Sequence, residues 1–285
     1  MQLYLCTSPL APDSLHLQSL VESMFAQLNG TKIALIGHSY GCNVAHAFLR
    51  RMSSSWKTQF IAGFLSLSGP FAGSFDALLA ILSGSFSQSH GIGFSAAELS
   101  ALARNVTSTN YLIPAASIYA ADEVMVRLGN SNFTHSQLDA MLRDTGLAAV
   151  AEWRSLIANV SADMGPPEVP TMCLRGYNTS TAFSIRYLDG TFNNAPSNVL
   201  VTSKDGDGIV PSPSLEVIVV LLAVVRVFSH QHPPQICAGW ASQQSQPVGD
   251  TPILNMPHGA ELFIQPVIDY VIQLLSPPSG EFEPL

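Results

Sequence analysis

The feature that most constrains the fold is the stretch LIGHSYGC at residues 35–42. A short apolar run at 32–36 enters Gly37-x-Ser39-x-Gly41, and a segment with helical periodicity follows at 43–52. A Gly-x-Ser-x-Gly turn between a strand and a helix is the nucleophile elbow, whose small neighbours let the serine hydroxyl rise above the carboxyl edge of a parallel sheet. The pattern predicts Ser39 as a nucleophile. The alternative is a serine in an ordinary glycine-rich turn.

Strands and helices alternate on both sides of this turn. Apolar residues recur with helical spacing over 13–28, with Asp13 or Ser14 as the expected N-cap, and residues 60–70 have the pattern of a strand. This order favours an α/β-hydrolase-type fold, a mostly parallel sheet with helices on both faces. We also predict a strand at 3–6 and, further along the chain, a strand at 171–178, a hairpin arm at 184–192, a strand that begins at 251 and a helix at 264–275.

The chain is predicted to have a core that is interrupted by an inserted cap. Residues 1–70 form the first part of the core, 71–169 a cap and lid with helices at 94–106 and 136–160, and 170–285 the rest of the core. An odd apolar insertion lies at 217–236. Its run of nine apolar residues before Arg226 is far shorter than the roughly 20 that a membrane-spanning helix needs.

A serine hydroxyl needs a base, and the base needs an orienting carboxylate. In this fold the chain order is Ser, then Asp or Glu, then His. Only His258 follows a late strand, so it is the predicted base, whereas His46 is expected to be a packing or solvated residue. The loop SKDGDGIVP offers both Asp205 and Asp207 as the carboxylate, although Asp-Gly is also a common turn.

Composition limits the possible partners and the compartment. The formal charge is −8, and no basic patch stands out, so we expect no nucleic-acid partner. Charged residues make up only 11% of the chain, which suits contact with lipid or a glycosylated secreted protein. The four cysteines have no zinc-site spacing. Five Asn-x-Ser/Thr sequons favour the secretory pathway, at Asn29, Asn105, Asn132, Asn159 and Asn178.

Nearly the whole chain resembles the lecithin:cholesterol acyltransferase family, including its lysosomal phospholipase A2 branch. The resemblance rests on IGHSYGCNVAHAFL, on WKTQFIAGFLSLSGPFAGS, on NSNFTHSQLDAML, on CLRGYNTSTAFSIRY and on DGDGIVPSPSLEV. It implies Ser39 as the nucleophile, His258 as the base and Asp207, rather than Asp205, as the acid. It also implies that the backbone N–H of Tyr40 is one donor of the oxyanion hole.

The resemblance carries further expectations. Cys173 matches a family half-cystine, and Cys237 is its implied partner across the 217–236 insertion. Cys42 matches a free cysteine, and about residues 83–113 correspond to a mobile lid. The family's amino-terminal part, with its second oxyanion donor and its membrane-binding subdomain, has no counterpart in this sequence, so we expect a fragment of a longer protein without a visible signal peptide.

The functional expectation is an O-acyltransferase or phospholipase A that acts at a membrane or lipoprotein surface. Its substrates would be a phospholipid and water, a sterol or another lipid alcohol, and it would need no metal or organic cofactor. The resemblance places it in the secretory pathway, either lysosomal or extracellular. The alternatives are a neutral-lipid lipase or esterase and a truncated, catalytically impaired lipid-binding pseudoenzyme.

Overall fold

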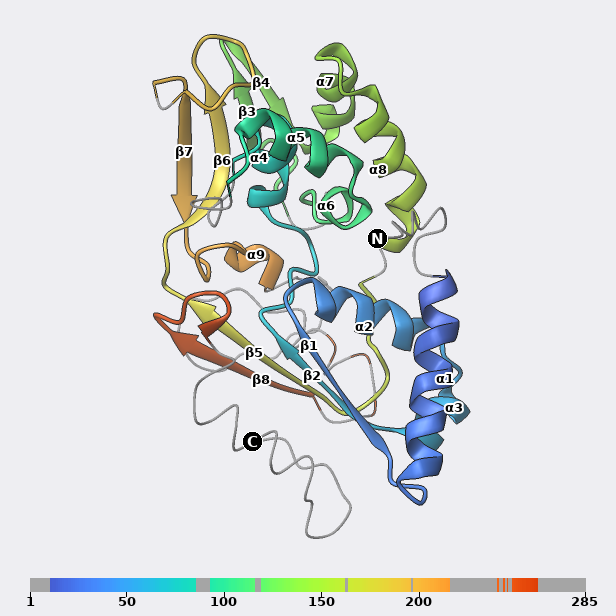
Figure 1. Cartoon of the computed structure of the whole chain (residues 1–285). Helices are drawn as coiled ribbons and strands as arrows, with labels where there is room; N and C mark the ends of the chain where they lie inside the picture. The colour runs from blue at the N-terminus through green and yellow to red at the C-terminus, as the bar shows by residue number, and fades with distance from the viewer. Residues whose placement is uncertain are drawn as a thin grey trace.

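Two four-stranded sheets organise the molecule, one in the lower and one in the upper half of Figure 1. The structure, a computed structural model, describes residues 11–85, 93–115, 119–161, 164–195, 197–215 and 248–260, together with 240, 243 and 245. Within these residues no helix is both long enough and apolar enough to cross a membrane. The predicted strand at 3–6, the apolar run at 217–228 and the helix at 264–275 lie outside the described residues.

The first sheet is entirely parallel, in the order β1-β2-β5-β8. The core strands that were predicted within the described residues are present, and all four strands of the sheet run in one direction because helices or long connections separate them. The bounds are β1 Ile33–His38, β2 Ile61–Leu67, β5 Thr171–Tyr177 and β8 Val248–Leu254. The predicted parallel α/β core is therefore confirmed.

Three helices accompany the first two strands. The helix predicted over 13–28 is α1, Ala11–Gln27, and it already includes Asp13 and Ser14, so the prediction of either residue as its N-cap was wrong. Pro12 in the first turn fits this earlier start, because proline lacks only an N–H that the first turn leaves unbonded. The elbow helix is α2, Tyr40–Arg51, and the short α3, Ser54–Phe60, was not predicted.

The second sheet is mixed, in the order β4-β3-β6-β7. The hairpin of β3 and β4 comes from residues 124–134, where the sequence indicated helices and loops. It pairs in parallel with β6, which lies beyond β5 in the chain, so segments far apart in sequence share one sheet. The bounds are β3 Val124–Leu128, β4 Ser131–Thr134, β6 Thr181–Tyr187 and β7 Val199–Lys204.

The helix predicted at 94–106 is present around this sheet, and the segment predicted as a helix at 136–160 is divided into η2, α7 and α8 (Figure 1). Gly84 ends α4 with a φ of 68°, and a Cβ there would lie against the backbone of Ala96, so only glycine fits where α5 begins. The bounds are α4 Phe75–Ser83, α5 Ala96–Asn105, α6 Thr107–Tyr111, η2 His135–Gln137, α7 Leu138–Asp144 and α8 Ala148–Ser161. The short α9, Ser212–Leu215, follows the loop at 205–211 that carries Asp205 and Asp207, called the acid loop below. The division into core and cap domains stays a prediction.

Each sheet has its own buried apolar cluster. Phe75, Leu78 and Ile81 of α4 pack with Ile185 and Tyr187 of β6 in the cluster beneath the second sheet. The cluster of the parallel sheet joins α1, α2 and the strands, with Phe48, Leu49, Phe64 and Trp240 among its fully buried members.

The loop 164–168, which leads into β5, is held by polar side chains of the core. The carbonyls of Met164, Gly165, Pro166 and Pro167 accept hydrogen bonds from Trp240, His46, Arg50 and Lys57 at 2.9, 2.7, 3.2 and 3.1 Å, respectively. His46 is buried and stacks on Trp240 with 5.1 Å between ring centroids, so its predicted packing role is confirmed. These bonds fix the start of β5 relative to α2 and α3.

Candidate active site

The serine of the Gly-x-Ser-x-Gly turn has the strained backbone expected of an elbow. Ser39 joins β1 to α2 with φ 52° and ψ −129°, a conformation that non-glycine residues rarely adopt. Its N–H donates to the Leu67 carbonyl at 2.9 Å, which ties the turn to the end of β2. Its side chain makes no capping bond to α2, so Oγ is directed elsewhere.

The two glycines of the motif have different roles. A Cβ on Gly37 would lie 2.8 Å from Cα and 2.9 Å from N of Cys42, and backbone atoms cannot give way cheaply. A Cβ on Gly41 would meet nothing within 4 Å. The requirement for a small residue therefore holds at Gly37 and is absent at Gly41, although the motif treats the two positions alike.

A histidine from a loop beyond β8 reaches this serine. His258 Nε2 lies 2.9 Å from Ser39 Oγ, and His258 Nδ1 lies 2.7 Å from Asp207 Oδ2. The side chains of His258 and Asp207 are 6% and 0% exposed. The three residues therefore form one hydrogen-bonded series across segments that are far apart in the chain, with the acid and the imidazole buried and Ser39 partly exposed.

Asp207 is held by the backbone of its own loop. Its Oδ1 accepts hydrogen bonds from the N–H groups of Ile209 at 3.0 Å and Val210 at 2.8 Å, which leaves Oδ2 for the imidazole. The His258 N–H also donates to the Asp207 carbonyl at 2.7 Å. The acid thus fixes both the ring and the backbone of the histidine. Gly176 of β5 makes room for this approach, because a Cβ there would collide with the Met256 carbonyl.

The neighbouring carboxylate, Asp205, contacts neither the histidine nor the serine in any hydrogen bond among the described residues. It is exposed, and its oxygens accept from the Asn178 N–H at 2.5 Å and from Ser212 Oγ at 2.7 Å. Asn178 in turn donates from Nδ2 to Asn255 Oδ1 at 2.6 Å. Asp205 therefore joins the ends of β5 and β8 to the acid loop, a role that the sequence did not indicate.

Two aromatic neighbours complete the surroundings. The His38 ring lies 5.2 Å from the His258 ring at an angle of 41°, and it occupies the variable position before Ser39. The Tyr40 ring makes an edge contact with Tyr111 of α6 at 5.7 Å. Tyr40 is the first residue of α2, so its N–H is at the helix end that favours negative charge. Its assignment as an oxyanion donor stays a prediction.

The structure describes some, but not all, of the predicted cysteine, lid and glycosylation residues. Cys42 is free and fully buried, as expected, and Cys173 takes part in a disulfide. The pairing with Cys237 stays a prediction because Cys237 lies outside the described residues, as do residues 86–92 of the expected lid. Asn29, Asn105, Asn132 and Asn178 are exposed, and Asn159 lies in α8, so glycosylation stays a prediction.

Comparisons with known proteins find similarity to the lecithin:cholesterol acyltransferase family. A family model described as lecithin:cholesterol acyltransferase matches residues 13–159. The phosphatidylcholine-sterol acyltransferase of Mus musculus is 29% identical over 264 residues, which is 91% of this chain and 54% of that protein. The lysosomal phospholipase A and acyltransferase of Rattus norvegicus is 28% identical over 200 residues, 70% of this chain and 46% of that protein.

The chain therefore spans about half the length of the curated relatives it matches. Among solved structures, the Tle4–Tli4 complex matches at 16% identity with a TM-score of 0.45, covering 70% of this chain and 53% of that one.

Proposed function

Because the chain belongs to the lecithin:cholesterol acyltransferase family, we propose that it is a serine-dependent lipid acyl enzyme. It would cleave an acyl ester of a phospholipid and pass the acyl group to water or to a lipid alcohol. The observation that best supports this proposal is the series of short contacts from Asp207 through His258 to Ser39. The names of the relatives point to phosphatidylcholine as acyl donor and to a sterol as one acceptor.

In the proposed first half-reaction, Ser39 Oγ attacks the ester carbonyl carbon while His258 Nε2 takes its proton. Asp207 keeps the Nδ1–H of the ring directed at itself, so that Nε2 is the basic nitrogen, and it stabilises the imidazolium that forms. The Tyr40 N–H would donate to the developing oxyanion. Collapse of the tetrahedral intermediate breaks the ester C–O bond, and His258 Nε2–H protonates the departing lysophospholipid oxygen.

The second half-reaction repeats these steps with a different nucleophile. Water or a lipid alcohol attacks the acyl-serine, His258 accepts its proton, and Ser39 leaves with that proton restored. The choice between the two acceptors depends on how well the site excludes water. This route uses no metal or organic cofactor. Because the proposed substrates are lipids, we propose that the reaction occurs at a membrane or lipoprotein surface.

We further propose that the protein acts in the secretory pathway. The exposed sequon asparagines and the disulfide at Cys173 support an oxidising compartment in which glycans are added. One group of relatives is lysosomal by name, so a lysosomal or an extracellular site of action fits. Digestion with an N-glycosidase after expression in animal cells, followed by measurement of the mass shift, tests this part of the proposal.

The function is tested by incubating the protein with phosphatidylcholine that carries a labelled acyl chain, with and without a sterol. We expect a labelled fatty acid, a labelled sterol ester, or both, and no product from a Ser39→Ala variant. A triacylglycerol substrate is the comparison. Turnover of triacylglycerol alone would indicate a neutral-lipid lipase, and equal product from wild type and Ser39→Ala would contradict the proposal.

A further inference from the structure

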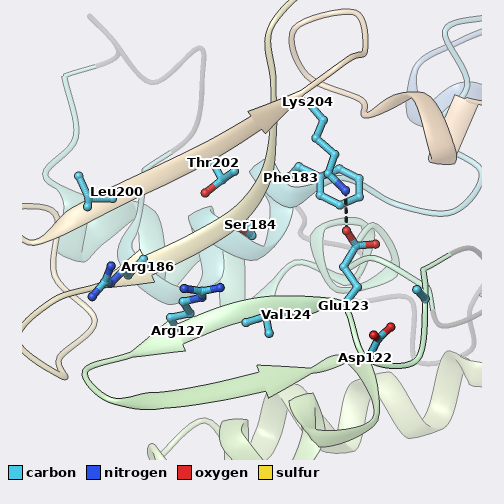
Figure 2. Close-up of a pocket in the computed structure, with 11 residues that line it drawn as sticks. Asp122, Glu123, Val124, Arg127, Phe183, Ser184, Arg186, Leu200, Thr202 and Lys204 are labelled. Carbon is cyan, nitrogen blue, oxygen red and sulfur yellow. Dashed lines mark hydrogen bonds and ion pairs between the residues drawn. The ribbon is translucent and has the colours of Figure 1, made fainter.

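A pocket on the second sheet is separate from the serine site and is not used by the proposed reaction. It has a volume of about 550 Å³ and lies between β3, β6 and β7 (Figure 2). Arg186 and Ser184 line it, whereas Ile185 and Tyr187, which alternate with them, are buried in the core. The arginine end of the pocket therefore opens on the face of the sheet that is turned away from its apolar cluster, while Phe183 of that cluster borders the other end, beside Lys204.

Two arginines stand side by side in this pocket. Arg127 of β3 and Arg186 of β6 are register partners in the parallel pair, and Figure 2 shows both side chains on the same side of the sheet. Both are exposed, and neither side chain forms an ion pair or a hydrogen bond in the described part of the chain. Like charges directly across from each other destabilise a sheet, so this pair has a cost that a bound anion would remove.

The other charges of the pocket confine the positive region to this pair. Lys204 is paired with Glu123 at 2.6 Å, and its Nζ lies 3.6 Å from the centre of the Phe183 ring. Asp122 lines the same end as Glu123 (Figure 2). Two guanidinium groups with acidic neighbours match a compact oxyanion. They do not match a polyanion such as nucleic acid, which needs a longer row of cations.

Apolar surface adjoins the arginines. Leu200 of β7 is the register partner of Arg186, lines the pocket and is 50% exposed. An anion whose organic part is apolar can bond to the guanidinium forks and also cover Leu200, which a free inorganic ion cannot do.

We propose that Arg127, Arg186 and Leu200 form a binding site for a phosphate ester with an apolar organic part, as in the head group of an anionic lipid. The Arg127–Arg186 row lies five register positions along β6 from Thr181, the partner of Lys204 beside the acid loop. At roughly 3.3 Å per residue this is about 16 Å of strand, so the site is distinct from Ser39. The proposal does not depend on the function of the serine.

The probes for this site are hexyl phosphate and inorganic phosphate, neither of which has an acyl ester that Ser39 could cleave. We expect hexyl phosphate to bind at least about tenfold more tightly than inorganic phosphate, because its chain covers Leu200. Arg127→Gln and Arg186→Gln should each weaken hexyl phosphate about tenfold. Arg186→Lys should recover only part of the affinity, since lysine keeps the charge and loses the bidentate fork. Isothermal titration calorimetry measures all of these affinities.

Two further variants make the result specific. Leu200→Ser should weaken hexyl phosphate and leave inorganic phosphate unchanged. Arg143→Gln, at an exposed arginine of α7 that does not line the pocket, should change neither affinity. Without ligand, the Arg127→Gln and Arg186→Gln variants should unfold at the same temperature as wild type or slightly above it, because both arginines are exposed and removing one relieves repulsion.

Hexyl phosphate binding that is the same in wild type and in the Arg127→Gln/Arg186→Gln double variant would overturn the proposal, as would no binding to wild type. If both ligands bind equally and both depend on the arginines, the assignment to a lipid head group is wrong, and soluble phosphate is the ligand.

Discussion

The two sheets differ in how their strands are assembled and in which residues they carry. Ser39 and His258 lie in the loops after β1 and β8 of the parallel sheet, whereas Asp207 comes from the loop after β7 of the second sheet and bonds to His258 through both its carboxylate and its carbonyl. The second sheet joins a hairpin from 124–134 to strands from 181–204 and carries a charged pocket on its open face. The first sheet therefore carries two of the three hydrogen-bonded groups, and the second sheet carries Asp207 at one end and the pocket on its open face.

The largest expected effect comes from the acid in the loop that follows β7. Asp207→Asn should lower the rate of ester hydrolysis about 10⁴-fold, because an amide favours the wrong tautomer of His258. Asp205→Asn makes the same change from carboxylate to amide at the neighbouring aspartate. It should lower the rate only about tenfold, because it displaces the loop slightly. Hydrolysis of a chromogenic ester measures both. An Asp205→Asn variant that is as impaired as Asp207→Asn would contradict this assignment.

The second effect is on the stability of the mixed sheet. Ile185 of β6 is fully buried, and Ile185→Ala should lower the free energy of unfolding by about 2–5 kcal/mol. Ile185→Val leaves most of the side chain and should cost only about 0.5–1.5 kcal/mol. Urea denaturation measures both. If the two variants are equally stable, the packing described for this cluster is incorrect.

The elbow glycines provide a third, smaller comparison within the parallel sheet. Gly37→Ala should destabilise the protein by about 1–3 kcal/mol, because its Cβ would press on the backbone of Cys42, and should also lower activity. Gly41→Ala has open space around its Cβ and should be neutral in stability. Thermal unfolding measures the stability of the two variants, and ester hydrolysis measures their activity. Equal damage at both positions would show that the turn is tighter than described.

The smallest effect concerns the loop that leads into β5 and depends on pH. A hydrogen bond from Lys57, together with its charge, lowers the pKa of Glu168 below its usual value. Because the folded pKa is lowered, this pair stabilises the protein above the ordinary pKa of a glutamate, and the stabilisation is lost as pH falls through the folded value. The Glu168 side chain is 46% exposed, so Glu168→Gln should cost no more than about 1 kcal/mol at neutral pH.

Urea denaturation at neutral and at acidic pH measures this difference, which should shrink on acidification. Glu152→Gln, at an exposed glutamate of α8 with no ion-pair partner among the described residues, is the control and should show no such trend. A Glu168→Gln difference that stays constant with pH would mean that the carboxylate charge is not what holds the loop.

The parallel core was predictable because its signals are local. The elbow, the apolar strands and the position of His258 after the last strand can each be recognised within about ten residues. The hairpin at 124–134 was missed because β4 is only Ser131–Thr134, a short polar strand whose partners lie elsewhere in the chain. The loop pattern left both Asp205 and Asp207 as candidates for the carboxylate, because only tertiary contacts direct one of them at His258.

The most direct test of the central claim is labelling with a fluorophosphonate, which reacts only with an activated serine. We predict one covalent adduct, mapped to Ser39 by peptide mass spectrometry, and a labelling rate that falls about 10⁴-fold or more in a folded His258→Gln variant. If the folded wild-type protein takes up no label, or if His258→Gln is labelled at Ser39 as fast as wild type, then the series from Asp207 to Ser39 does not activate the serine.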